Sequence, residues 1–157
     1  MARLPGISRN LSAFLDMIAV SEGTAGIGDD GYDVLVGSTK AHPHLFHGYE
    51  SHPNAVIDLG RIKSSAAGRY QILKGIFAHY QITLDLPDFS PESQDKIAIR
   101  LIKECGALDE IEAKKIVRAI YLCRSRWASL PGAGYGQREN RIDRLLVAFK
   151  DAQGDTA

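Results

Sequence analysis

The sequence is short of cysteine, of net charge and of long apolar runs, and each shortage excludes a class of protein. Its 157 residues include two cysteines, Cys105 and Cys123, both in apolar segments with helical spacing, so we expect reduced core thiols and no disulfide framework. The 19 basic and 19 acidic side chains cancel, which argues against a nucleic-acid partner, because neutralising phosphates needs an excess of Lys and Arg. No run of about eighteen apolar residues occurs, so we expect no stable membrane insertion.

The first twenty residues are the only segment that resembles an export signal. Asp16 interrupts its apolar part, and the sequence SEGT follows where a small-x-small cleavage site would be required. We therefore expect no signal peptide.

Histidines crowd one segment, which suggests a metal site at first sight. His42, His44, His47 and His52 fit no standard zinc spacing, and neither paired cysteines nor an HExxH pattern accompanies them. We expect no metal and no other cofactor.

Apolar periodicity predicts a mostly helical chain. A helix over Ser8–Ser21, capped by Ser8 or Asn10, should end at Glu22-Gly23, where a glycine-rich stretch begins. Another should start with Ser90 as N-cap and Pro91 in the first turn and end at Gly106. Further helices are expected over residues 66–82, 107–123 and 138–151.

A small β element is expected between the first helix and the rest. Residues 32–38 are rich in β-branched and aromatic side chains, and shorter strands are expected near 45–49 and 55–60. A chain of this length fits one domain. The predicted architecture is α+β: a single domain over 1–157 with a β-containing lobe at about 31–65 and a helical remainder.

Six stretches of the chain resemble the phage lambda-type endolysins in order and spacing. The resemblance covers the chain from about Leu11 to Phe149. The stretches are AFLDMIAVSEGT (13–24), GYDVLVG (31–37), SSAAGRYQIL (64–73), DFSPESQD (88–95), IKECGAL (102–108) and RWASLPGAGYGQ (126–137). The resemblance implies a lysozyme-like fold and a lytic transglycosylase that cleaves the MurNAc-β-1,4-GlcNAc bond of peptidoglycan with formation of a 1,6-anhydro-muramyl product.

Glu22 is the candidate catalytic residue. From its position alone, a glutamate at a helix end is more often a solvated side chain than a catalytic one. The resemblance, however, places the family's catalytic glutamate on Glu22. One carboxyl suffices for this reaction, first as acid and then as base, because the C6 hydroxyl of the substrate supplies the nucleophile.

Several polar residues are expected to support Glu22 or to bind the glycan. Asp33, which matches the family's GYD pattern, is predicted to contact substrate or to support the site. By resemblance, Gln71 lies at a helix start near the glutamate, where its amide would hydrogen-bond an N-acetyl group or orient Glu22. Tyr135 lies between two glycines that should expose its ring, and the resemblance implies that it stands on the cleft wall, with Gln137 as a weaker neighbour. Ser64 and Ser65 offer hydroxyls to the site or cap a helix, and capping is the favoured interpretation.

Two alternatives remain open from the sequence. One is a hydrolytic muramidase that uses Asp33 as its second carboxylate. The other is a non-catalytic glycan-binding virion protein on the same scaffold. By resemblance, the expected partner is the peptidoglycan glycan strand. The expected setting is a monomer in the host cytoplasm until a holin releases it to the periplasm.

Overall fold

The computed structural model describes residues 1–136 and 138–154, and its helix α1 (Arg9–Glu22) begins and ends where the sequence predicts. The Ser8 hydroxyl accepts a hydrogen bond from the backbone N–H of Leu11, so Ser8 is the N-cap. Gly23, at φ +76°, ends the helix in the left-handed conformation. The apolar face of α1 is fully buried, which leaves Glu22 as the last helical residue at the edge of the core.

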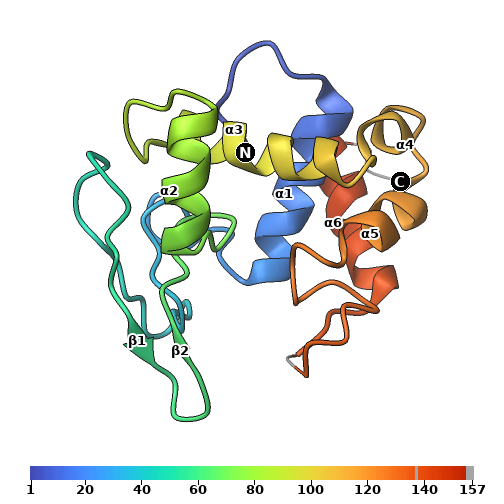
Figure 1. Cartoon of the computed structure of the whole chain (residues 1–157). Helices are drawn as coiled ribbons and strands as arrows, with labels where there is room; N and C mark the ends of the chain where they lie inside the picture. Colours follow the sequence, from blue (N-terminus) through green and yellow to red (C-terminus); the bar gives the residue numbers. More distant parts are fainter. Residues whose placement is uncertain (137, 155–157) are drawn as a thin grey trace.

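Five more helices complete the helical part of the described chain (Figure 1). Ser90 caps α3 and Pro91 opens it, as predicted, and Gly106 adopts the predicted left-handed conformation just beyond its end. Helix α6 packs along α1. The helices are α2 (Lys74–Thr83), α3 (Pro91–Glu104), α4 (Leu108–Glu112), α5 (Ile116–Cys123) and α6 (Ile142–Gln153). No helix in the described residues is both long and apolar enough to cross a membrane.

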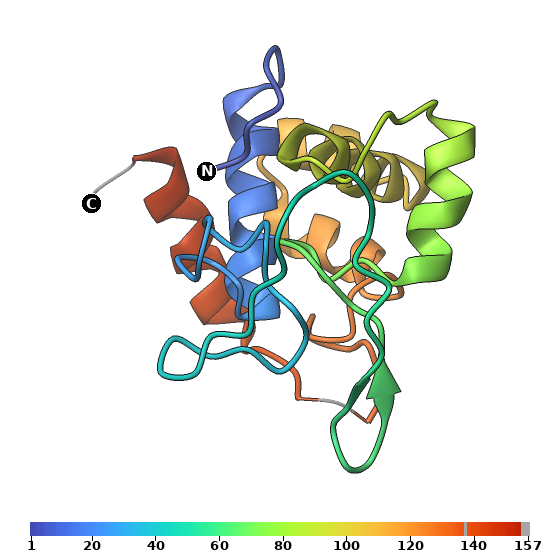
Figure 2. The same ribbon diagram turned by 90° about the vertical axis from the view of Figure 1, so that its left-hand side faces the viewer.

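The β element is smaller than predicted. Strands β1 (Ile57–Asp58) and β2 (Lys63–Ser64) pair antiparallel in a hairpin that projects on the side away from α5 and α6 (Figures 1 and 2). The predictions of strands over 32–38 and 45–49 are wrong, since these segments form only isolated bridges. The Ser38 hydroxyl donates to the backbone carbonyl of His44 and accepts its backbone N–H. These two bonds close a turn after a single β-bridge, so the pairing does not extend into a strand. The predicted α+β class is confirmed.

The predicted helix over 66–82 is wrong in its first half, because residues 66–73 fold back on the β segment. The backbone N–H of Gly68 donates to the carbonyl of Val34, and the Ala67 backbone pairs with both Leu35 and Ile72. At Gly68 (φ +79°) an added Cβ would lie 2.2 Å from Oε1 of buried Gln94. These long-range bonds satisfy the backbone groups that a helix would have satisfied locally. Helix α2 therefore starts only at Lys74.

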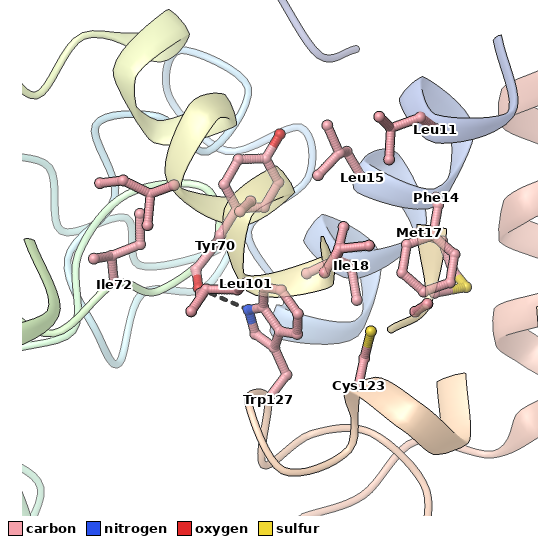
Figure 3. Close-up of a cluster of buried hydrophobic side chains, with 14 of the residues drawn as sticks. Leu11, Phe14, Leu15, Met17, Ile18, Tyr70, Ile72, Leu101, Cys123 and Trp127 are labelled. Carbon is pink, nitrogen blue, oxygen red and sulfur yellow. Dashed lines mark hydrogen bonds between the residues drawn. The ribbon is translucent and has the colours of Figure 1, made fainter. Parts of the chain in front are cut away.

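The hydrophobic core joins all the helices through one cluster of buried side chains (Figure 3). Trp127 is buried there, and its indole Nε1–H donates to the carbonyl of Tyr70 at 3.1 Å. Cys123 is buried and Cys105 half-buried, and both are free thiols. The indole bond ties the segment after α5 to the segment before α2.

A buried arginine fixes the glycine-rich loop that follows Glu22. Arg69 is 1% exposed, and its guanidinium pairs with Asp16 at 2.9 Å and with Asp30 at 3.3 Å. Its backbone carbonyl accepts the hydroxyl of buried Thr24 at 2.6 Å. The two ends of the loop, Thr24 and Asp30, are therefore held by one residue, so the chain beyond Glu22 is positioned by the core.

Candidate active site

Glu22 is a half-buried carboxyl whose protonation is shifted by its surroundings. Removal from water raises its pKa from 4.5 to about 7, although a hydrogen bond from the Ser129 hydroxyl opposes part of that rise. The apolar face of α1 supplies the low-polarity surroundings. Near neutral pH the carboxyl is thus poised between its acid and base forms, which proton transfer in both directions requires.

A chain of hydrogen bonds holds Glu22 from the far end of the sequence. The Ser129 hydroxyl donates to Oε1 of Glu22 at 2.7 Å and lies 2.8 Å from the Ser21 hydroxyl. The Asn140 amide donates to both the carbonyl and the hydroxyl of Ser21. Because the Ser129 proton is used on Glu22, Ser21 must donate to Ser129.

The chain therefore has one direction, from Asn140 through Ser21 and Ser129 to Glu22. Arg144 in turn donates to the side-chain oxygen of Asn140 at 2.9 Å, which fixes the orientation of the amide. Bonding of Oε1 by Ser129 leaves the other oxygen of Glu22 available for a transferred proton. Ser129 and Asn140 are absent from the sequence-based predictions, although Ser129 lies within the RWASLPGAGYGQ stretch.

Gln71 and Tyr135 lie near one small hollow. The hollow, of about 210 Å³, is lined by Gln71, Trp127 and Ser125 among others. The Tyr135 hydroxyl donates to the carbonyl of Ser125 at 2.9 Å, and its ring is 57% exposed between two left-handed glycines. Since Trp127 lies two residues before Ser129, the turn that lines this hollow also carries the donor to Glu22.

The helical placement predicted for Gln71 is wrong. Gln71 precedes α2 and has a positive φ of 50°, and its amide donates to the carbonyl of Gly68 at 2.9 Å. A left-handed non-glycine residue is unusual and is held here by the fold-back of residues 66–73. The strained backbone turns Gln71 into the hollow without a helix.

The remaining predicted site residues make local contacts. The Asp33 carboxylate accepts the backbone N–H of Asp29 at 2.8 Å, at the C-terminal end of the glycine-rich loop. The Ser65 hydroxyl accepts the N–H of Lys74, and that of Ser64 accepts the N–H of Ala66, but the N-cap of α2 is Leu73, so neither serine is a helix N-cap. Substrate contact by these three residues stays a prediction. Gln137 lies outside the described residues.

No metal-binding arrangement is found near these residues. Within 1–136 and 138–154, no three His, Cys, Asp or Glu side chains converge as metal ligands would. His52 is buried, its Nε2 lies 2.7 Å from the carbonyl of Ile72, and its ring packs against Phe77 and Phe89. Burial lowers the pKa of His52, so this residue belongs to the core.

Comparison with known proteins gives consistent matches over nearly the whole chain. A family model described as Endolysin matches residues 12–156. The endolysin of Escherichia phage P2 is 50% identical over 93% of this chain and 94% of its own length, and that of Escherichia phage lambda is 46% identical over 94% of each. The lysozyme of bacteriophage lambda, solved in complex with a chitohexasaccharide, superposes with a TM-score of 0.89 at 45% identity, covering 95% of this chain and 97% of that one.

These matches agree with the fold. A second structure of the lambda lysozyme superposes with a TM-score of 0.84. The sequence identity, the coverage and the shared fold lead to one conclusion, which confirms the resemblance found from the motifs: this chain belongs to the endolysin family.

Proposed function

We propose that the chain is a lytic transglycosylase that cleaves the MurNAc-β-1,4-GlcNAc bond of peptidoglycan and leaves a 1,6-anhydro-muramyl product. The observation that carries the proposal is the Glu22 carboxyl, whose pKa is raised to about 7 and which is hydrogen-bonded by Ser129, two residues after Trp127 in the lining of the Gln71 hollow. Family membership supports a cell-wall glycan as the substrate, since a related lysozyme was solved with a chitohexasaccharide. Asp33, the alternative second carboxylate, is engaged by the backbone of Asp29.

One carboxyl accounts for both proton transfers of this reaction. Protonated Glu22 gives its proton to the glycosidic oxygen as the bond from C1 of the muramyl residue breaks. The resulting carboxylate then takes the proton of the C6 hydroxyl of the same residue, whose oxygen bonds to C1 and closes the anhydro ring. Glu22 ends protonated, as it began, and no water is consumed. The hydrogen bond from Ser129 to Oε1 stabilises the carboxylate between the two steps.

The pH dependence of the reaction rate should follow the titration of the Glu22 carboxyl. The rate on purified peptidoglycan should fall about tenfold per pH unit above pH 7, because the acid step needs the protonated form. In Ser129→Ala the alkaline limb should move upward by about half to one pH unit, since the lost hydrogen bond favours the carboxylate. Profiles of kcat/KM against pH measure both effects.

Ser125→Ala is the matched control for Ser129→Ala. Ser125 lies near the same hollow and offers its carbonyl, not its hydroxyl, to Tyr135. Its profile should overlay that of the unmodified chain. An alkaline limb that stays in place, or moves downward, in Ser129→Ala would show that this hydroxyl does not stabilise the Glu22 carboxylate.

Product analysis separates the proposed reaction from the alternatives. Mass spectrometry of digested peptidoglycan should show muramyl products lighter by one water than those of a hydrolase, with no reducing end at that residue. Reducing muramic acid would indicate a hydrolytic muramidase. A chain that never clears permeabilised Gram-negative cells in a turbidity assay would instead be a non-catalytic glycan-binding protein.

The proposed setting follows from family membership. We propose that the chain acts as a monomer, stays in the host cytoplasm and reaches the periplasm when a holin opens the inner membrane. Fractionation of cells that express the chain with and without a holin tests this. Periplasmic activity in the absence of the holin would contradict it.

A further inference from the structure

A second hollow is lined by residues of α5, of α6 and of the segment just before α5. These two helices lie on the side of the molecule away from the β1–β2 hairpin (Figure 1). The volume of the hollow is about 980 Å³, within the range of ligand-binding clefts. Neither Glu22 nor Gln71 lines it. The lining side chains are Lys114, Lys115, Ile116, Val117, Arg118, Tyr121, Leu146, Phe149, Lys150 and Gln153, and we call this hollow the α5–α6 groove.

The α5–α6 groove carries positive charge only. Its lining includes Lys114, Lys115, Arg118 and Lys150 and no carboxylate, and none of the four forms an ion pair within the described part of the chain. Two nearby acids, Glu112 and Asp151, do not line the groove. The Glu112 carboxylate accepts the Ser8 hydroxyl. Asp151 lines a different hollow beside Asp16 and Arg144.

In a chain without net charge, this local excess of cations gives the groove a strong preference for an anionic partner.

The same surface exposes apolar side chains that face solvent beside the cations. Val117 is 56% exposed and Tyr121 49% exposed, and they lie four residues apart on one face of α5. The guanidinium of Arg124 lies 3.6 Å from the centre of the Tyr121 ring, and that of Arg118 lies 5.4 Å from it. Tyrosine and aliphatic side chains flanked by Lys and Arg are typical of helices that lie in a membrane interface, where the cationic ends reach the head groups.

We propose that the α5–α6 groove docks the protein on a bilayer rich in anionic phospholipid. The four cations meet the phosphates, while Val117, Tyr121 and the apolar floor meet the glycerol and upper acyl region. An acidic peptide is less suited to the groove, because a peptide backbone needs hydrogen-bond partners and the lining between the cations is apolar. The association is peripheral and leaves the Glu22 face, at the other end of the α1–α6 pair, free.

Sedimentation with lipid vesicles tests this docking. The unmodified chain should sediment with vesicles of equal parts phosphatidylglycerol and phosphatidylcholine at low salt, and not with phosphatidylcholine alone. Added salt should weaken the association. Lys114→Gln/Lys150→Gln should lower the partition coefficient about thirty-fold, from about 1 kcal/mol per cation. Val117→Asn should lower it several-fold through its apolar contact alone.

Lys96→Gln/Lys103→Gln is the control, because it removes two exposed lysines of α3 and gives the same net charge. It should bind the anionic vesicles like the unmodified chain. Equal losses in the two double variants would overturn the proposal in favour of unspecific charge attraction. Absence of vesicle binding by the unmodified chain, or tighter binding to soluble polyglutamate than to anionic vesicles, would overturn it as well.

The membrane docking and the proposed reaction can be tested separately, so that failure of one proposal is distinguishable from failure of the other. Both double variants should digest purified, lipid-free peptidoglycan at the unmodified rate. Loss of that activity in Lys114→Gln/Lys150→Gln alone would show that the groove serves the reaction and not a bilayer, and would therefore overturn the proposal.

Discussion

Glu22→Gln should lower the rate of peptidoglycan cleavage by about a thousandfold, within the range that general acid–base catalysis contributes. The amide keeps the shape of the side chain, and its oxygen still accepts the hydrogen bond of Ser129. It cannot donate a proton to the glycosidic oxygen or take one from the C6 hydroxyl. Clearing of purified peptidoglycan, followed by turbidity, measures the loss.

The same variant should gain stability at alkaline pH. The folded-state pKa of about 7 lies above the ordinary 4.5, so the native protein holds a proton that the unfolded chain releases. Native stability therefore falls as pH rises from about 4.5 through 7, and the amide removes this fall. At pH 8, urea unfolding should show Glu22→Gln more stable by about 1–3 kcal/mol, with no difference at pH 4.

Full activity in Glu22→Gln would refute the catalytic assignment. The variant could instead be inactive but no more stable than the unmodified chain at pH 8. That result would show that burial of the carboxyl does not raise the pKa of Glu22.

Asp95→Ala should lower the free energy of unfolding by about 4 kcal/mol. The buried carboxylate accepts the hydroxyls of Tyr32 and Tyr70, at 2.8 and 2.5 Å, and the backbone N–H groups of Arg3 and Leu4. Its removal leaves two buried tyrosine hydroxyls and two part-buried backbone N–H groups without their acceptor. Urea unfolding measures the change.

Asp143→Ala is the control for Asp95→Ala. Asp143 lies in an exposed ion pair with Arg141 at 3.4 Å, and its loss should change stability by less than about 0.5 kcal/mol. A loss below about 1 kcal/mol in Asp95→Ala would show that water replaces the carboxylate among the four donors.

The helices that local signals define could be read from the sequence. Ser8 and Ser90 cap α1 and α3 as expected, because a cap depends on residues within one turn. The prediction that residues 66–73 are helical is wrong, because their backbone pairs with Val34 and Leu35, more than thirty positions away. Local periodicity carries no information on such contacts.

In the candidate site, too, residues with a local sequence signal could be predicted and those placed by long-range contacts could not. Glu22 was found through the resemblance of its surroundings, and the end of α1 through Gly23. Ser129, 107 positions from Glu22, gave no local signal of its own, nor did Asn140, which acts through Ser21. The packing of α6 along α1 brings Asn140, which lies just before α6, to the end of α1, and the turn after α5 brings Ser129 to the carboxyl. The burial that raises the pKa of Glu22, and the hydrogen bond from Ser129 that opposes part of the rise, are therefore properties of the fold.

The central claim, that Glu22 works alone with an intramolecular nucleophile, is tested most directly by digesting peptidoglycan in water enriched in heavy oxygen. The account predicts anhydro-muramyl products without any label, because no water enters the reaction. The same unlabelled product should form, at whatever rate, in Asp33→Asn. Heavy oxygen at C1 of muramic acid would contradict the account and identify a hydrolase.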